Sequence, residues 1–393
     1  MRVRGAVAGL AVVCLGLLAA AAYSAWPSFG AYPNGARLVR VQSSPQWGGG
    51  RFRNPEPMWN DMRGAVREAF RTNPADAPRS PIPVLANAEA QYVAPPRSGL
   101  RVTWFGHSSA LIEIDGVTLL TDPIWSERSS PVSWAGPVRW HAPAVPLRSL
   151  PPVDAVLISH DHYDHLDRAT VQALDDGRVR FIVPLGVGAH LAAWGIAESR
   201  ITELDWWDST RVGRVDLIAT PSRHASGRID PQSGQTLWAG YAMVGPAHHA
   251  WYSGDTGKEA AFAEIGRRYG PFDVTLIEAG QYDAAWPDWH LGPEQAVDAN
   301  RLVRGRVMIP VHWALFKLAH HGWTEPAERV LAAARCGDTV HVLMPRPGQA
   351  VEPTASPTLS RWWPAVAWNS AAERPVVATR HGDPLDRFRT AHC

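Results

Sequence analysis

The sequence predicts an α/β fold in which helices cover two β-sheets. Residues 101–105, 110–114 and 117–120 alternate apolar and polar side chains as strands do, and Asp115-Gly116 is a hairpin signal between the second and the third. From residue 155 onward, short apolar runs alternate with helical patterns. Early hairpins followed by strand–helix alternation fit two sheets better than one parallel sheet.

The elements after residue 150 are expected to alternate regularly. Further strands are predicted at 155–158, 180–183, 215–219, 238–244, 249–252, 274–277, 307–311 and 340–344. Helices are predicted at 168–173, 188–194, 258–268, 290–302 and 325–333. Asp167 precedes the first of these helices and is suited to cap its N-terminus.

Length and composition are those of a globular protein. The chain has 393 residues, which is enough for one large domain or two modest ones. Hydrophobic residues make up 46% of it and charged residues 19%, which suits a sizeable core. The formal net charge is +1, so the charge does not indicate a nucleic-acid partner.

The N-terminus has the pattern of an export signal. Arg2 and Arg4 precede an apolar run at residues 6–22. Such a segment is either cleaved or kept as a membrane anchor. We therefore expect membrane association through this segment and a location in the cell envelope, either periplasmic or anchored to the outer side of the cytoplasmic membrane.

Composition divides the chain into four regions. Residues 1–25 are the signal peptide or N-terminal membrane anchor, and residues 26–98 form an irregular extension with one helix at 58–70. Residues 99–350 form the main domain, and 351–393 a C-terminal tail. The long loop at 125–150 is expected to be a functional lid. The 19 tryptophans are expected to pack in the core or to line an apolar or membrane-interface surface.

One short stretch concentrates metal-binding side chains. His160, His162, Asp164 and His165 lie on a turn between a predicted strand and a predicted helix. Structural zinc sites are usually closed and rich in cysteine, and the three cysteines of this chain lie elsewhere. Histidine and carboxylate ligands with room for water therefore favour a catalytic metal site.

The pattern His-x-His-x-Asp-His resembles the metal-binding signature of the metallo-β-lactamase superfamily. This resemblance implies a four-layer αββα sandwich and three more ligands in the order His, Asp, His. His224, Asp255 and His312 occur in this order, each just past a short apolar strand. By the resemblance, one metal is held by His160, His162 and His224, the second by Asp164, His165 and His312, and Asp255 bridges them.

The resemblance also implies the cofactors and the catalytic groups. The nitrogen-rich ligand set favours two zinc ions, with iron or manganese as alternatives. A hydroxide bridging the two ions would attack the substrate, with Asp164 orienting it and His290 contacting the substrate. His107 and Asp122 follow strand ends and are expected to orient ligand imidazoles through hydrogen bonds.

Longer segments indicate which branch of the superfamily the chain resembles. The segments at 102–108, 121–137, 204–208, 224–228, 290–294 and 311–313 together resemble the N-acylphosphatidylethanolamine-hydrolysing phospholipase D and lactonase-like branch. This implies cleavage of a phosphodiester in an N-acylphosphatidylethanolamine-like phospholipid. A lactonase or other cyclic-ester hydrolase, and a non-catalytic metal-binding envelope protein, are the alternatives. Acyl specificity, oligomeric state and pairing of Cys336 with Cys393 stay open.

Overall fold

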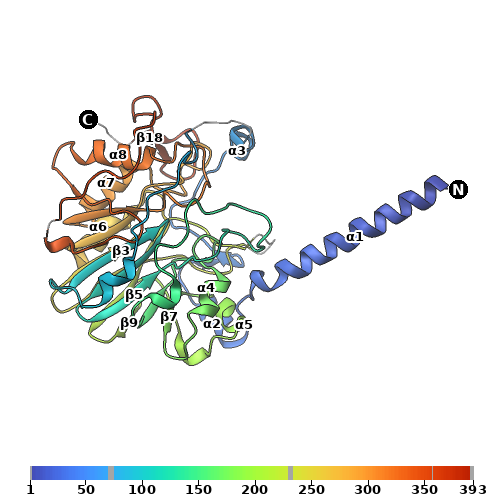
Figure 1. Ribbon diagram of the computed structural model, residues 1–393, viewed down its shortest axis with the longest axis horizontal. Coiled ribbons are helices and arrows are strands. Elements are labelled where there is room, and N and C mark those ends of the chain that lie inside the picture. The colour runs from blue at the N-terminus through green and yellow to red at the C-terminus, as the bar shows by residue number, and fades with distance from the viewer. Residues whose placement is uncertain (1, 70–74, 229–232, 356, 390–393) are drawn as a thin grey trace.

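The computed structural model describes residues 2–69, 75–228, 233–355 and 357–389. Within these residues, two seven-stranded sheets lie against each other and helices cover them (Figure 1). The first sheet has the order β16-β3-β4-β5-β6-β7-β8, and the second β15-β14-β13-β12-β11-β10-β9. The predicted αββα sandwich is confirmed.

The strands of the two sheets have the following bounds. The first sheet contains β3 (Leu100–Gly106), β4 (Ser109–Ile114), β5 (Val117–Thr121), β6 (Ala155–Leu157), β7 (Arg180–Pro184), β8 (Ile201–Leu204) and β16 (Ala350–Val351). The second contains β9 (Ser209–Val212), β10 (Val215–Thr220), β11 (Gly240–Val244), β12 (His249–Tyr252), β13 (Val274–Glu278), β14 (Val307–Val311) and β15 (His341–Val342). Two small ribbons pair β1 (Trp47–Gly48) with β2 (Arg51–Phe52) and β17 (Val377–Thr379) with β18 (Arg387–Arg389).

The helices cover the outer faces and the N-terminal region. They are α1 (Arg2–Phe29), α2 (Gly35–Gln42), α3 (Met62–Ala69), α4 (Arg168–Ala173), α5 (Gly188–Ala193), α6 (Ala261–Tyr269), α7 (Pro293–Leu302) and α8 (Glu325–Ala334). Short 3₁₀ turns lie at Ala88–Tyr92, Leu147–Ser149, Glu198–Arg200 and Pro353–Ala355. The capping residue predicted for α4 is in place, because the side chain of Asp167 accepts from the Ala169 N–H.

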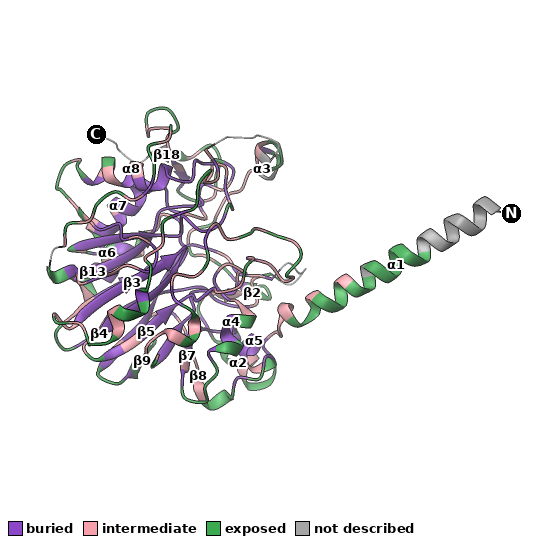
Figure 2. Cartoon of the chain, in the orientation of Figure 1, coloured by how far each residue is buried: buried purple, intermediate pink, exposed green. Residues whose placement is uncertain are grey.

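The first sheet is buried on both faces. Successive side chains of a strand point to opposite faces, so Ile112 lies in the large cluster between the sheets. Its neighbour Leu111 lies in a second cluster, which also contains Val171 of α4 and Leu191 of α5. Figure 2 shows the resulting buried strands inside a more exposed shell of helices and loops.

Several elements differ from the predictions. The helix expected at 58–70 begins at Met62, and residue 70 lies outside the described residues. The strand expected at 340–344 has two residues, His341–Val342. The short polar edge strands β8 and β9 were not predicted. Cys393 lies outside the described residues.

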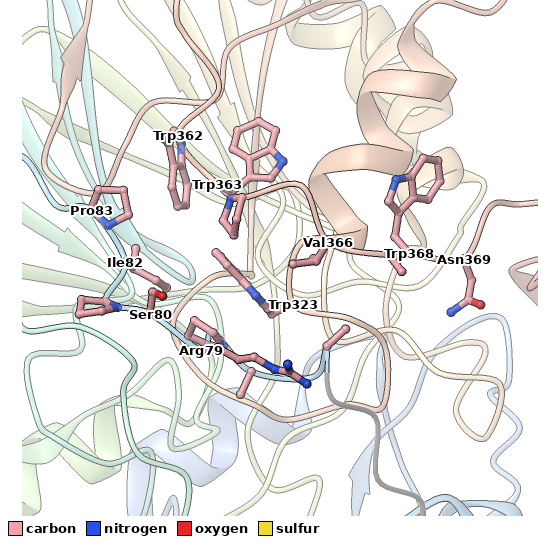
Figure 3. A pocket seen from close by; sticks show the side chains of 16 residues that line it. Arg79, Ser80, Ile82, Pro83, Trp323, Trp362, Trp363, Val366, Trp368 and Asn369 are labelled. Atoms are coloured by element: carbon pink, nitrogen blue, oxygen red, sulfur yellow. The ribbon is translucent and has the colours of Figure 1, made fainter.

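The N-terminal extension and the tail both pack on the sandwich. β16, at residues 350–351, adds an edge strand to the first sheet by pairing with β3. Trp362 of the tail stacks on Trp313 at 5.4 Å between ring centroids. A cavity of about 830 Å³ separates residues 75–83 of the extension from residues 362–369 of the tail, with Trp323 in its wall (Figure 3).

Helix α1 projects away from the sandwich (Figure 1). Of the helices in the described part of the chain, it alone has an apolar stretch long enough to cross a membrane, Val12–Phe29, with a mean hydropathy of 1.6. The helix meets the domain at its C-terminal end, where the Trp194 indole donates a 2.8 Å hydrogen bond to the Pro27 carbonyl.

Replacing Arg329 with Met should destabilise the fold. Arg329 is 1% exposed, and its guanidinium donates two 2.8 Å hydrogen bonds to Glu294, which joins α8 to α7. The substitution leaves Glu294 buried without its charge partner, which should cost about 3–5 kcal/mol in the free energy of unfolding measured with urea. Arg178→Met is the control, because the Arg178 side chain is 85% exposed and its pair with Asp176 lies at the surface. Equal losses in the two variants would contradict the assignment.

Candidate metal centre

Four strand ends bring the predicted ligands together. His160 follows β6, His224 follows β10, Asp255 follows β12 and His312 follows β14. The first of these strands belongs to one sheet and the other three to the second sheet. Loops beyond strand ends gather functional groups in α/β folds, and here the ends of both sheets meet at one place.

Three histidines form a first ligand group. The Nε2 of His160 lies 2.8 Å from the Nδ1 of His162, and the Nε2 of His224 lies 3.3 Å from that same Nδ1. Zinc–nitrogen bonds of about 2.1 Å at tetrahedral angles separate two ligand nitrogens by roughly 3.4 Å. The three imidazoles are therefore close enough to hold one ion together.

A carboxylate and two histidines form a second group. Asp164 Oδ2 lies 3.4 Å from His165 Nε2 and 3.5 Å from His312 Nε2. The two imidazole nitrogens are 3.3 Å apart. This spacing also fits a single ion, so the structure brings the predicted second set together.

Asp255 lies between the two groups. Its Oδ2 is 3.9 Å from His160 Nε2 and 3.8 Å from His224 Nε2 on one side. On the other side it is 3.0 Å from His165 Nε2 and 3.2 Å from His312 Nε2. Its Oδ1 is buried and has no hydrogen-bond partner within the described residues. A carboxylate with one unpartnered oxygen between two imidazole groups fits a ligand that bridges two cations.

Electrostatics show that this place favours positive charge. Burial disfavours the charged forms of His165 and His312, but Asp255 and Asp164 outweigh it and raise the pKa of both imidazoles well above its usual range. Burial likewise opposes ionisation of Asp255, yet His165 and His312 hold its pKa well below normal. By contrast, burial and neighbouring His165 lower the pKa of His160, so this ring stays neutral and able to bind a metal.

Asp122 and His107 contact the ligands directly. The Asp122 Oδ2 lies 2.7 Å from His165 Nδ1, and it also accepts from the Ser159 hydroxyl at 2.5 Å. His107 Nε2 lies 2.8 Å from Asp164 Oδ2. His107, Asp122 and His312 have positive φ values of 51°, 34° and 67°, so strained backbone conformations cluster at the site.

Two carboxylates at the site were not anticipated from the sequence. Asp161 accepts from the Gly227 N–H at 2.7 Å and from the Thr236 hydroxyl at 2.8 Å, which fixes the turn between His160 and His162. Glu278 is fully buried, and its Oε2 lies 2.8 Å from His290 Nδ1. The position of Glu278 directly after the predicted strand 274–277 was the available signal.

An apolar cavity of about 340 Å³ opens onto the ligands. It is lined by Asp164, Asp255, His290 and His312 together with Trp286, Trp289 and Leu318, and by Asn60 and Ala65 of the extension. The predicted lid was wrong, because residues 125–150 do not line this cavity; helix α3 and the 281–290 loop do. His321, on the loop before α8, is buried and accepts from the Gln281 N–H at 2.8 Å.

Comparison with known proteins places this site in a family. Residues 118–313 match the β-lactamase superfamily domain. An uncharacterized protein of Mycobacterium tuberculosis is 47% identical over 346 residues, covering 86% of this chain and 91% of that protein. N-acyl-phosphatidylethanolamine-hydrolyzing phospholipase D 1 of Caenorhabditis elegans is 35% identical over 233 residues, covering 56% of this chain and 65% of that protein.

Solved structures agree at the level of the fold. Isothiocyanate hydrolase from Delia radicum gut bacteria aligns with a TM-score of 0.52 at 20% identity, covering 64% of this chain and 98% of that one. A possible metal-dependent hydrolase from Veillonella parvula aligns with the same TM-score of 0.52 at 15% identity, covering 64% and 98%. With its two packed sheets and its His/Asp ligand groups at their strand ends, the chain belongs to the metallo-β-lactamase superfamily of metal-dependent hydrolases.

Proposed function

We propose that the protein uses a dinuclear metal site to cleave a phosphodiester in an N-acylphosphatidylethanolamine-like phospholipid. The observation that carries this proposal is the apolar cavity of about 340 Å³ directly above two adjacent ligand groups. The similarity to the phospholipase D of Caenorhabditis elegans, which includes 35% identity over 233 residues, supports the same substrate class.

The cavity suits a substrate with a polar centre and apolar arms. Its lining combines the carboxylates of Asp164 and Asp255 with the apolar side chains of Trp286, Trp289 and Leu318. The Trp289 ring stacks on the His162 imidazole, with 6.2 Å between centroids and 7° between planes. The aromatic wall therefore begins at a metal ligand, which brings hydrocarbon close to the reacting group.

Different side chains of the site would orient the substrate and the attacking water molecule. Glu278 accepts a hydrogen bond from His290 Nδ1, so the opposite nitrogen of His290 is left for the substrate. The pKa of Asp164 is held well below its normal range, chiefly because His165 outweighs burial, so Asp164 stays ionised and can orient a water molecule as an acceptor. His107 holds that carboxylate in place from behind.

The ligands fit two divalent cations. His160, His162 and His224 would hold one, Asp164, His165 and His312 the other, and Asp255 both; zinc is favoured by the nitrogen-rich set. Bound at these ligands, the two cations would activate water and neutralise charge developing on the phosphoryl oxygens.

We also propose that α1 keeps the enzyme in the cell envelope. Its apolar stretch, Val12–Phe29, is 6% buried in the structure and would be exposed to water along its length outside a membrane. Anchoring by this helix would bring the cavity to a lipid substrate.

Metal content is the first test of the proposal. The purified protein should contain close to two metal ions per chain. Asp255→Ala should lower this number and reduce activity by at least about a hundredfold. This loss is larger than the one expected on removal of a residue that only hydrogen-bonds to a metal ligand. Circular dichroism should stay unchanged. Asp216→Ala on β10 is the control and should keep both metal and activity, because the Asp216 side chain is 40% exposed and pairs with Arg211 at the surface. A fully folded protein that binds no metal would exclude the dinuclear site.

Metal affinity should rise with pH. In the metal-free protein, the raised pKa of His165 and His312 keeps protons on both rings to a higher pH than on ordinary histidines. A cation must displace these protons, so its affinity falls as the pH is lowered. Zinc titration against a competing chelator between pH 6 and pH 8, roughly spanning normal histidine titration, measures this slope. A pH-independent affinity would contradict it.

The reaction products identify the class of substrate. Incubation of the metal-loaded protein with bacterial phospholipids and N-acylphosphatidylethanolamine, followed by mass spectrometry, should release phosphatidic acid and an N-acylethanolamine. Asp255→Ala is the matched negative control. Turnover of lactones alone would replace the proposal with a cyclic-ester hydrolase, and turnover of neither class would favour a non-catalytic metal-binding envelope protein.

A further inference from the structure

A further cavity, lined largely by polar side chains, lies where α1 joins the domain. It has a volume of about 220 Å³ and is lined by Ser28 at the end of α1, by residues 126–133 of the long loop, and by residues 163–172 around α4. Arg128, Arg168 and Arg228 reach it from three segments. It shares no lining residue with the cavity above the metal ligands.

Among the residues that the structure describes, the arginines of this cavity form no direct ion pair with a carboxylate. Arg228 is 1% exposed and donates to the carbonyls of Ser28 at 2.7 Å and Asp161 at 2.6 Å. Its guanidinium also lies 4.0 Å from the centre of the Tyr163 ring. Its hydrogen-bond partners are neutral. The carboxylates of Asp161 and Asp167 favour its charge from farther away, but burial outweighs them and lowers the pKa of Arg228, so its charge is only partly compensated. An anionic ligand nearby would compensate its charge.

Arg168 and Arg128 retain hydrogen-bonding capacity. The Nε of Arg168 is shielded from solvent and has no hydrogen-bond partner among the described residues. Arg128 uses its Nε and Nη1 on the carbonyls of Ser133 and Gly136. Of the two carboxylates in the lining, Asp167 already accepts from Ser126 and from the α4 N-terminus, and Glu127 is exposed. The cavity thus has a surplus of positive charge and unused N–H donors, which matches a phosphate group.

The place of the cavity indicates the source of the phosphate. Ser28 is the penultimate residue of the apolar stretch Val12–Phe29, so a membrane crossed by α1 would put the cavity at the level of the lipid head groups. The same loop carries Trp134, which is 62% exposed, and Val138, which is 41% exposed. Exposed tryptophan beside arginine is typical of a membrane interface.

We propose that this arginine cavity binds the phosphate of an anionic phospholipid, separately from the metal centre. The inference rests on the membrane position proposed for α1 and extends it to the catalytic domain. The loop at 125–150 then serves as a lipid-contacting surface at the base of the anchor.

Binding of a soluble lipid probe tests the site. The full chain in neutral detergent is titrated with dihexanoyl phosphatidic acid by isothermal calorimetry, and dihexanoyl phosphatidylcholine and inorganic phosphate are compared. Arg168→Met removes one charged hydrogen-bond donor and should weaken phosphatidic acid binding about tenfold. Arg128→Met is a second variant and should weaken it as well. Phosphatidylcholine and inorganic phosphate should each bind at least about tenfold more weakly than phosphatidic acid.

Two controls separate this site from others. Arg178→Met, an exposed arginine just after α4, should leave binding unchanged. His224→Ala, which removes a metal ligand, should also leave it unchanged, so the result does not depend on turnover or on the proposed activity. Absence of saturable binding, equal affinity in the wild type and both arginine variants, or inorganic phosphate binding as tightly as the lipid would overturn the proposal.

Discussion

The buried carboxylate of Asp255 is the constraint on which the metal centre depends. It is 3% exposed and lies where the strand ends of both sheets meet. A buried carboxylate is costly unless positive charge compensates it. Here the compensation comes from imidazoles, and its Oδ1 is left without a partner among the described residues. Packing of the two sheets thus creates a site with a buried negative charge that positive charge can compensate. The surrounding histidine nitrogens determine which cations the site prefers.

A single buried ion pair ties the terminal regions to this centre. Arg223, directly before the proposed ligand His224, lies 3.3 Å from Asp288, which in turn precedes His290 by two residues. The same guanidinium donates to the carbonyl of Glu56 at 3.2 Å, and Asp288 accepts from the Thr379 N–H at 2.7 Å. The extension, the tail and two loops of the site therefore converge on one pair of charges. This explains why the cavity wall can be built from the extension, since Asn60 follows the anchored segment directly.

The sequence was most informative where potential metal-binding residues lie close together in the chain. The stretch from His160 to His165 can be recognised in the sequence because four potential metal ligands fall within six positions. The order of ligands implied by the resemblance then points to His224, Asp255 and His312. The two-sheet fold follows from periodicity and turn signals. Short edge strands such as β8 are not predicted, because a run of four residues with polar neighbours shows little hydrophobic periodicity. The lining of the cavity could not be predicted for another reason. Ala65 and Trp286 are brought together by tertiary packing, which their spacing in the chain does not indicate.

Helix α1 and the turn that carries His160 and His162 are connected through side chains. His190 accepts from the Ala31 N–H through Nδ1 at 3.2 Å, so its Nε2 carries the proton that is donated to Asp161 at 3.1 Å. Arg228 forms a second link, from the Ser28 carbonyl to the Asp161 carbonyl. Asp161 stands between His160 and His162, so both links end at the residue that separates two of the proposed metal ligands. A flexible linker would leave the site free to turn relative to a membrane. Two chains of hydrogen bonds that meet at Asp161 instead connect this turn to the C-terminal end of α1. A helix held in a bilayer would therefore also set the direction in which the cavity faces the lipid.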